Sequence, residues 1–218
     1  MRSPGESQVL KSFLTRQCEK NWRRPSSREG IFGNFCRALA SIDQDVTELD
    51  ELIDMSLTYA RLEYSSLQSN LEPTVLATWF DSQVNDASLL YTDKQIVPQV
   101  EIDPALRVVM DKRLMSYAMR NLLRNASKYA RTQIRVGLAV RHGNVEIFVE
   151  DDGTGVPESE REHIFDAFVR LDRHTGGYGL GLAITQQVLR AHKGRIGATD
   201  PQTLPGARFE ISWPAGTV

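Results

Sequence analysis

The sequence is poor in cysteine, having only Cys18 and Cys36, and both precede residue 40 of the 218-residue chain. Their spacing matches no common metal motif, so we expect reduced thiols rather than metal ligands or a disulfide framework. The chain has no apolar run near the roughly 18 residues that cross a bilayer, and no secretory pattern at its start. We therefore expect a cytoplasmic protein, connected to a membrane only through segments absent from this chain.

Neither sign of charge is in large excess, because 26 Lys and Arg residues stand against 28 Asp and Glu residues, a formal net charge of −2. This balance gives no general reason to expect nucleic acid or an anionic membrane surface as a partner. Hydrophobic residues make up 41% and charged residues 25% of the chain, which is typical of a globular protein. The length suits one domain with an appendage.

Two segments precede the domain. Residues 1–38 are rich in Arg and Lys and keep no apolar period, which predicts an atypical basic segment that is partly ordered or disordered. Residues 39–66 instead form a predicted amphipathic helix with a narrow apolar stripe. The stripe consists of Ile42, Val46, Leu49, Ile53 and Leu57. Such a helix needs a partner, either the following domain or a second chain in a helical bundle, and we favour the bundle.

The region 74–218 mixes helical and strand patterns without regular βαβ repetition. We predict helices at 75–90, at 112–129 with Asp111 as N-cap, and from the glycine-rich stretch to about residue 191. Strands are predicted in "QVEID", "LRVVMD", "TQIRVGLAV", "VEIFVED", "RIGAT" and "ARFEISW", the third and fourth forming a hairpin. The pattern predicts an α+β fold, a two-layer sandwich with helices on one face of a mixed sheet.

The helix before the hairpin contains "NLLRNASKYA", which places Asn121, Asn125 and Lys128 on one face. This face is either an ordinary solvated surface or part of a site. In the second interpretation Asn125 offers a carbonyl oxygen to Mg²⁺, Lys128 offers a charge to phosphate, and Tyr129 offers a ring to a base. A different, apolar stripe should face the sheet: Met115, Met119, Leu122 and Ala126.

The next segment, "VEDDGTGVP", follows a predicted strand and has the pattern D-x-G-x-G at Asp151, Gly153 and Gly155. It is either a simple turn or a base-recognition loop, in which the carboxylate accepts a hydrogen bond from an exocyclic amine such as adenine N6. In "HIFDAFVRLD" we expect Phe165 and Phe168 to be apolar anchors beside a mobile segment.

The stretch "TGGYGLGLAI" opens the last helix with glycines at 177, 179 and 181. Its spacing fits neither the P-loop nor the dinucleotide fingerprint. It is either a flexible turn or a phosphate site, because free backbone N–H groups and the positive end of a helix attract anions.

In their order along the chain, "NLLRNASKY", "DDGTGV", "IFDAFVR" and "GGYGLGLAI" resemble the N, G1, F and G2 boxes of bacterial sensor histidine kinases. The resemblance covers about residues 75–218 and implies the Bergerat ATP-binding fold of the GHKL superfamily. The helix at 39–66 resembles the second helix of the dimerisation hairpin of these kinases. The resemblance implies ATP and Mg²⁺ as cofactors, transfer of the γ-phosphate to a histidine, and relay to an aspartate of a response regulator.

The resemblance also implies roles for individual residues. Asn125 would ligate Mg²⁺, Tyr129 would pack on the adenine, and Asp151 would bind its amine. The phosphates would be held by Asn121, Lys128 and Arg170. The other ATP-binding positions that it implies are Gly153, Gly155, Val156, Phe168, Gly177, Gly179, Leu180 and Gly181.

The acceptor histidine of these kinases has no counterpart here. The chain has four histidines, none of which precedes the helix at 39–66, and we expect each to have an ordinary surface role: His142, His163, His174 and His192. Autophosphorylation of this chain alone is therefore not expected, and no catalytic residue is assigned. The alternatives are a nucleotide-binding regulatory module without autokinase activity, and, ranked last, a different ATPase of the superfamily. The expected partners are a response regulator and a second kinase chain.

Overall fold

The computed structural model describes residues 41–42, 46, 49, 52–53, 56–60, 70–172 and 178–216. The basic segment 1–38 and both cysteines lie outside the described residues, as do His174 and Gly177. The chain divides into two compact units, residues 1–52 and 53–218. The described residues between 41 and 60 are helical, and the five stripe residues named above are 49–57% exposed. Within the described residues, no helix has the length and apolar character needed to cross a bilayer.

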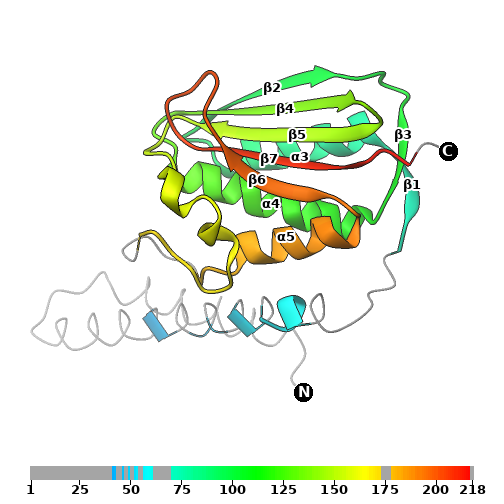
Figure 1. The fold of residues 1–218 in the computed structure, drawn as a ribbon. Helices are drawn as coiled ribbons and strands as arrows, with labels where there is room; N and C mark the ends of the chain where they lie inside the picture. Colours follow the sequence, from blue (N-terminus) through cyan, green and yellow to red (C-terminus); the bar gives the residue numbers. More distant parts are fainter. Residues whose placement is uncertain are drawn as a thin grey trace, which may run out of the picture. The chain divides into compact units, whose positions relative to one another are not determined.

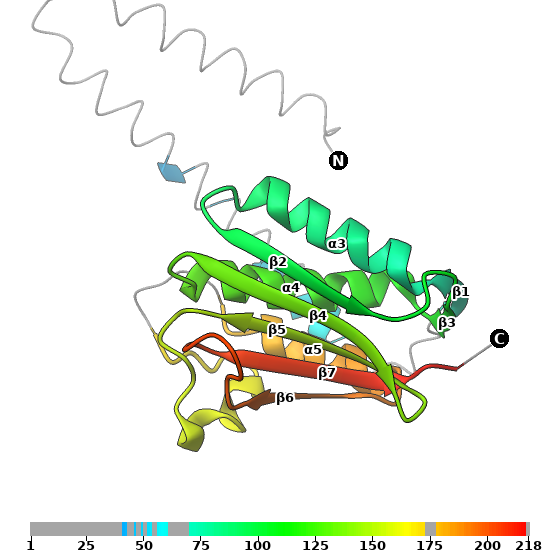
Figure 2. The same cartoon turned by 90° about the horizontal axis from the view of Figure 1, so that it is seen from above.

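A five-stranded mixed sheet forms one layer, with strand order β2-β4-β5-β7-β6 (Figures 1 and 2). Its strands are β2 (Gln95–Glu101), β4 (Gln133–Arg141), β5 (Asn144–Asp151), β7 (Arg208–Pro214) and β6 (Arg195–Thr199). Only the β2–β4 pair in this sheet is parallel. A separate antiparallel pair joins β1 (Glu72–Val75) to β3 (Arg107–Met110).

Three helices cover one face of the sheet (Figure 1). They are α3 (Leu76–Leu90), α4 (Lys112–Tyr129) and α5 (Gly181–Ala191). The predicted apolar stripe of α4 is buried, as are the alternating residues Ile134, Val136 and Leu138 of β4. The indole N–H of Trp79 on α3 donates to the Ser116 hydroxyl of α4 at 2.8 Å, within the core. The predicted α+β two-layer sandwich is confirmed.

The hairpin between β4 and β5 turns on two residues, His142 and Gly143, with φ values of 51° and 75°. This pair of positive φ values matches the tight hairpin turn whose twist suits the flanking strands. The predicted N-cap is also confirmed, because the Asp111 carboxylate accepts the N–H of Leu114 at 3.0 Å. Both features follow from local sequence alone.

The first half of the domain differs from the prediction. Residues 72–75 form β1, which was not predicted, and β2 begins at Gln95 rather than near residue 99. Strand β2 lies at an edge of the sheet, so its residues are mostly exposed and give little apolar alternation. An edge strand also tolerates Pro98, which a central strand would not.

The face of the sheet opposite the helices carries an open hollow of about 740 Å³, lined by residues that include Arg135, Phe148, Arg195 and Glu210. None of the predicted ATP-binding residues lines this hollow. The candidate site therefore lies elsewhere, at the ends of α4, β5 and α5.

Candidate functional site

Asp151 is the last residue of β5 and is only 2% exposed. Its Oδ1 accepts the backbone N–H groups of Gly153 at 2.8 Å and Ala207 at 3.2 Å. Its other oxygen, Oδ2, accepts no hydrogen bond from the described residues. Burial raises the pKa of Asp151 above its usual value, and the two backbone N–H groups only partly offset this effect. The carboxyl group is therefore held in one orientation with one oxygen uncommitted.

Two glycines allow the backbone to pack closely around Asp151. A side chain at Gly153 would overlap the backbone oxygen of Tyr129, and a side chain at Gly206 would overlap Asp151 itself. Gly155 has a φ of +75°, which glycine adopts without strain. The end of α4 and the loop after β5 are thus in direct contact.

Asp152 also connects the loop after β5 to the residues that follow α4. Its carboxylate accepts the backbone N–H groups of Arg131 at 2.7 Å and Thr132 at 3.0 Å, and the Thr132 hydroxyl at 2.7 Å. Desolvation opposes ionisation of Asp152, but these hydrogen bonds outweigh it and hold the pKa of Asp152 well below its usual range. Asp152 therefore stabilises the loop in its ionised form.

Glu150 and Arg208 form a buried ion pair behind this loop, with an N–O distance of 2.6 Å. The Glu150 side chain is fully buried and also accepts the backbone N–H groups of Thr203 at 2.6 Å and of Leu204. Desolvation works against the charge, yet the hydrogen bonds and Arg208 lower the pKa of Glu150. The pair fixes the loop between β6 and β7, which carries Ala207 to Asp151.

Along the polar face of α4, the exposure of the side chains increases toward the C-terminal end of the helix. Asn121 is 5% exposed, Asn125 is half-buried, and Lys128 is exposed. The Asn121 amide donates to the backbone oxygen of Gly181 at 3.2 Å, which joins α4 to the start of α5. The Lys128 ammonium lies 5.0 Å from the centre of the Tyr129 ring.

The start of α5 is held from two sides. The Thr185 hydroxyl donates to the oxygen of Gly181 at 2.8 Å, and Leu180 is buried. Gly179 has a φ of +72°, and its backbone oxygen accepts the N–H of Phe168 at 2.9 Å. This last bond closes the two ends of the segment 169–178 against each other. Residues 173–177, including Gly177, lie outside the described residues.

The prediction of two phenylalanine anchors is correct for Phe165 and wrong for Phe168. Phe165, in the short 3-10 helix η2 (His163–Phe165), is buried and meets Phe209 edge to face at 6.5 Å between ring centres. Phe168 has a φ of +68° and is 65% exposed. Its left-handed backbone conformation, needed to meet Gly179, turns the ring away from the core.

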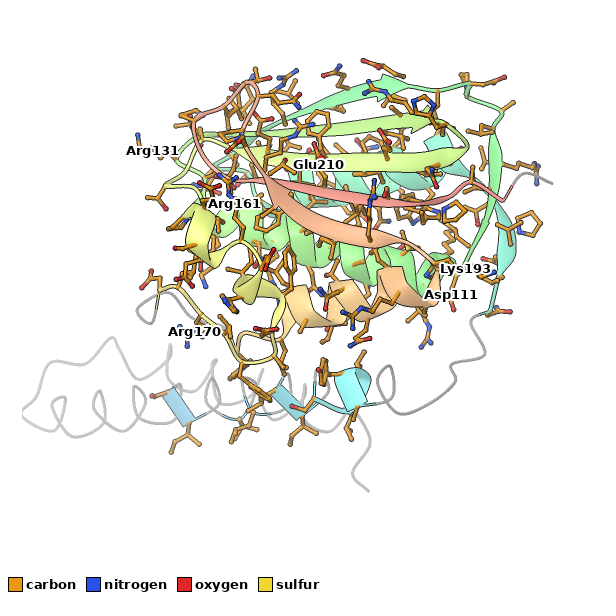
Figure 3. The ribbon with its side chains drawn as sticks, viewed as in Figure 1. Asp111, Arg131, Arg161, Arg170, Lys193 and Glu210 are labelled. Atoms are coloured by element: carbon orange, nitrogen blue, oxygen red, sulfur yellow. The ribbon has the colours of Figure 1, made fainter. Side chains whose placement is uncertain are left out.

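The remaining predicted residues lie on the surface near this segment. Arg170 is exposed and one of its N–H groups donates to the backbone oxygen of Asp172 at 3.2 Å. The oxygen of Val156 accepts a bond from Arg161, which follows the 3-10 helix η1 (Glu158–Glu160). Arg161 and Arg170 lie at one end of the domain, and Asp111 lies at the opposite end (Figure 3).

One histidine departs from its predicted surface role. His142 and His163 are exposed as expected, but His192 is 7% exposed and bonded at both ring nitrogens. Sequence reasoning placed His192 at a helix end, but no local signal showed that it would be buried and bonded to Asp111 at the N-cap of α4. It also missed Arg124, which donates to the Asn121 side chain at 3.2 Å.

These contacts join three segments: the C-terminal half of α4, the loop after β5, and the first turn of α5. Among the described residues no cluster of three His, Cys, Asp or Glu side chains could hold a metal ion. The segment at 168–170 is connected to the start of α5 by the bond from the Phe168 N–H to the Gly179 oxygen.

Residues 110–217 match the family described as histidine kinase-, DNA gyrase B- and HSP90-like ATPases. The chain is 36% identical to the sensor protein RstB of Escherichia coli over 178 residues, which are 80% of this chain and 41% of RstB. It is 44% identical to the Escherichia coli sensor histidine kinase CpxA over 101 residues, 44% of this chain and 22% of CpxA. The mycobacterial sensor histidine kinase MprB superposes with a TM-score of 0.59 at 27% identity, covering 68% of this chain and 99% of that structure.

The fold and these similarities define the class: residues 110–217 form an ATPase domain of the histidine kinase, gyrase B and HSP90 type. The chain belongs to the bacterial sensor histidine kinases. It spans less than half the length of the two curated relatives.

Proposed function

We propose that this chain is the ATP-binding catalytic region of a two-component sensor histidine kinase. It would transfer the γ-phosphate of ATP to a histidine outside this chain, for relay to an aspartate of a response regulator. The observation that carries the proposal is Asp151, a buried carboxyl group with one free oxygen, at the start of a loop that contacts the end of α4 in a domain of this family.

The proposed roles are those that the similarity to sensor histidine kinases implies, and the positions of the described side chains support them. The free oxygen of Asp151 accepts the 6-amino group of adenine, and Tyr129 packs on the base. Asn121, Lys128 and Arg170 contact the phosphates, and the first turn of α5 offers its free N–H groups to them. The other contacts are made by Gly153, Gly155, Val156, Phe168, Gly177, Gly179, Leu180 and Gly181. Phosphoryl transfer depends mainly on positioning and charge neutralisation, which such a set supplies.

The residues also fit Mg²⁺ as a cofactor. Mg²⁺ bound with a nucleotide takes few protein ligands and several phosphate and water oxygens. Half-buried Asn125 offers one such protein ligand, its amide oxygen. Asn125 would hold the ion through its amide oxygen, and the ion would supply neutralisation of phosphate charge.

The acceptor and partners are proposed from the rest of the chain. The helix at 39–66 acts as a dimerisation-type helix, and residues 74–218 act as the ATP-binding domain. The acceptor histidine then lies on a second kinase chain or on a segment outside this sequence, because the histidines of the chain all follow residue 141. We propose a cytoplasmic location and no nucleic-acid partner.

The alternative function takes account of the lack of an acceptor histidine in this sequence. Without a histidine before the helix at 39–66, the chain would be a nucleotide-binding regulatory module that lacks autokinase activity. ATP binding without transfer to any partner would support this alternative. Transfer to a histidine supplied on a second chain would support the kinase.

The test is to incubate the purified chain with Mg²⁺ and γ-labelled ATP, alone and with a kinase hairpin that carries an acceptor histidine. We expect nucleotide binding, no acid-labile label on the chain alone, and label on the added hairpin. The variant Asn125→Ala should abolish the transfer, and His142→Ala, in the exposed hairpin turn, should not change it. If no nucleotide binds, the proposal is wrong.

A further inference from the structure

Arg124 is an exposed residue of α4 whose guanidinium group is held at the first turn of α5. One terminal nitrogen donates to the side-chain oxygen of Asn121 at 3.2 Å. The same nitrogen lies 3.5 Å from the position that a Cβ atom would occupy on Gly181. Asn121 is in turn bonded to the Gly181 backbone, so the guanidinium is placed by a buried residue rather than free in solvent.

The charge of Arg124 has no ion-pair partner among the residues that the structure describes. Its neighbour is instead the N-terminal end of α5, which carries the positive end of a helix dipole. A cation beside this end is unfavourable unless an anion lies between them. Absence of a side chain at Gly181 leaves the backbone there accessible to such an anion.

We propose that Arg124 binds the phosphate chain of the nucleotide, together with the first turn of α5. The inference rests on the proposed function, since it assigns a further residue to the same site. A guanidinium group presents its N–H donors in a planar fork that matches two phosphate oxygens. Besides the phosphate contact proposed for it above, Asn121 orients this fork through its side-chain oxygen.

The experiment measures dissociation constants by titration calorimetry for ATP, ADP and adenosine in Mg²⁺ buffer, using the full chain. The variants are Arg124→Gln, Arg124→Lys and the control Arg120→Gln. Arg120 is an exposed arginine of the same helix, four residues earlier, with no partner among the described residues. The three ligands share the base and differ in the number of phosphates.

We expect Arg124→Gln to weaken ATP binding at least about tenfold, the loss typical of a charge-assisted hydrogen bond. It should weaken ADP binding less, or equally if the fork binds the inner phosphates, and leave adenosine binding unchanged. Arg124→Lys should recover part of the loss, because it restores the charge without the fork. Arg120→Gln should bind all three ligands like the wild type.

The inference is overturned if Arg124→Gln binds ATP as tightly as the wild type. It is equally overturned if ATP and adenosine are weakened by the same factor, because Arg124 would then act only through the structure of the site. A wild-type chain that binds adenosine but gains nothing from phosphates also contradicts it. A wild-type chain that binds none of the three ligands instead contradicts the proposed function itself.

Discussion

The Nε2 atom of His192 accepts the backbone N–H of Asp111 at 2.9 Å, although 81 residues separate them. The Nδ1 atom lies 2.8 Å from the backbone oxygen of Val188. Because a carbonyl oxygen only accepts, Nδ1 is the donor of this ring and Nε2 is its acceptor. His192 therefore joins the C-terminal end of α5 to the N-cap of α4.

Replacing His192 with alanine should lower the free energy of unfolding by about 1–3 kcal/mol, because the N–H of Asp111 loses its partner in a buried position. Urea unfolding followed by circular dichroism measures the change. His163→Ala is the matched control, since the His163 side chain is 68% exposed, and it should change stability by less than about 0.5 kcal/mol. Equal effects of the two changes would contradict this role for His192.

Glu150→Gln should destabilise the domain by about 3 kcal/mol, the low end for breaking a buried ion pair, because Arg208 keeps its bond to Glu210. The folded pKa of Glu150 is lowered from 4.5. Its stabilising contribution is therefore present above pH 4.5 and is lost as pH falls through the lower folded value. Urea unfolding at several pH values should show the difference between wild type and variant shrinking on acidification.

The control for this change is Glu210→Gln, because the Glu210 side chain is 42% exposed and contacts the same arginine. It should cost less than about 1 kcal/mol. A loss as large as that of Glu150→Gln would show that burial is not what makes the Glu150–Arg208 pair important.

Asp151→Asn should raise the melting temperature of the ligand-free domain at neutral pH while weakening adenine-nucleotide binding about tenfold or more. Burial raises the pKa of Asp151 above 3.8, so its favourable contribution is full below pH 3.8 and lost as pH rises through the folded value. Asparagine removes the buried charge and keeps an acceptor for Gly153. Scanning calorimetry at neutral and acidic pH tests this, with the difference disappearing in acid.

Asp152 provides the control, because its pKa shift is opposite in direction to that of Asp151. The pKa of Asp152 is lowered by hydrogen bonds to its ionised form, so its contribution is present at neutral pH and lost in acid. Asp152→Asn should therefore lower the melting temperature at neutral pH. A shift in the same direction for both variants would contradict the assignment of opposite pKa shifts.

Gly179→Ala should weaken ATP binding and reduce stability by about 1–2 kcal/mol, because a residue with φ of +72° strains any other side chain. The added Cβ would also lie 2.7 Å from the carbonyl carbon of Phe168, where the two ends of segment 169–178 meet. Gly197→Ala is the control, since a Cβ at Gly197 meets no atom within 4 Å. Thermal unfolding and ATP titration of both variants test whether the contact between Phe168 and Gly179 supports stability and ATP binding.

The features of the domain that the sequence predicted correctly are those that depend on residues close together in the chain. The apolar period of α4, its Asp111 cap and the His142–Gly143 turn each depend on neighbouring residues, and all three predictions are confirmed. The boundaries of β2 could not be predicted, because an exposed edge strand lacks alternation. Phe168 was wrongly placed because its conformation depends on a bond to Gly179 across the undescribed segment 173–177.

The sequence predicted the residues of the candidate site, which stay a prediction as ligand-binding residues, but it could not predict the contacts between them. The order of the motifs pointed to Asp151 and to the asparagines of α4. Their partners are distant in sequence, as in the bond from Asn121 to Gly181 across 60 residues. Burial of His192 and the Glu150–Arg208 pair also required tertiary packing, which no local pattern encodes.

The bond between Asp151 and Ala207 sets the time at which the site can form during synthesis. When the ribosome has just added Asp151, its partner is still 56 residues away. Strand β7, which pairs with β5, also emerges after α5 and β6. Contacts of such large sequence separation form late in folding. A nascent chain that stops before Ala207 thus lacks the arrangement around Asp151, so the nucleotide recognition that we propose for this carboxyl group would have to await translation of nearly the whole domain.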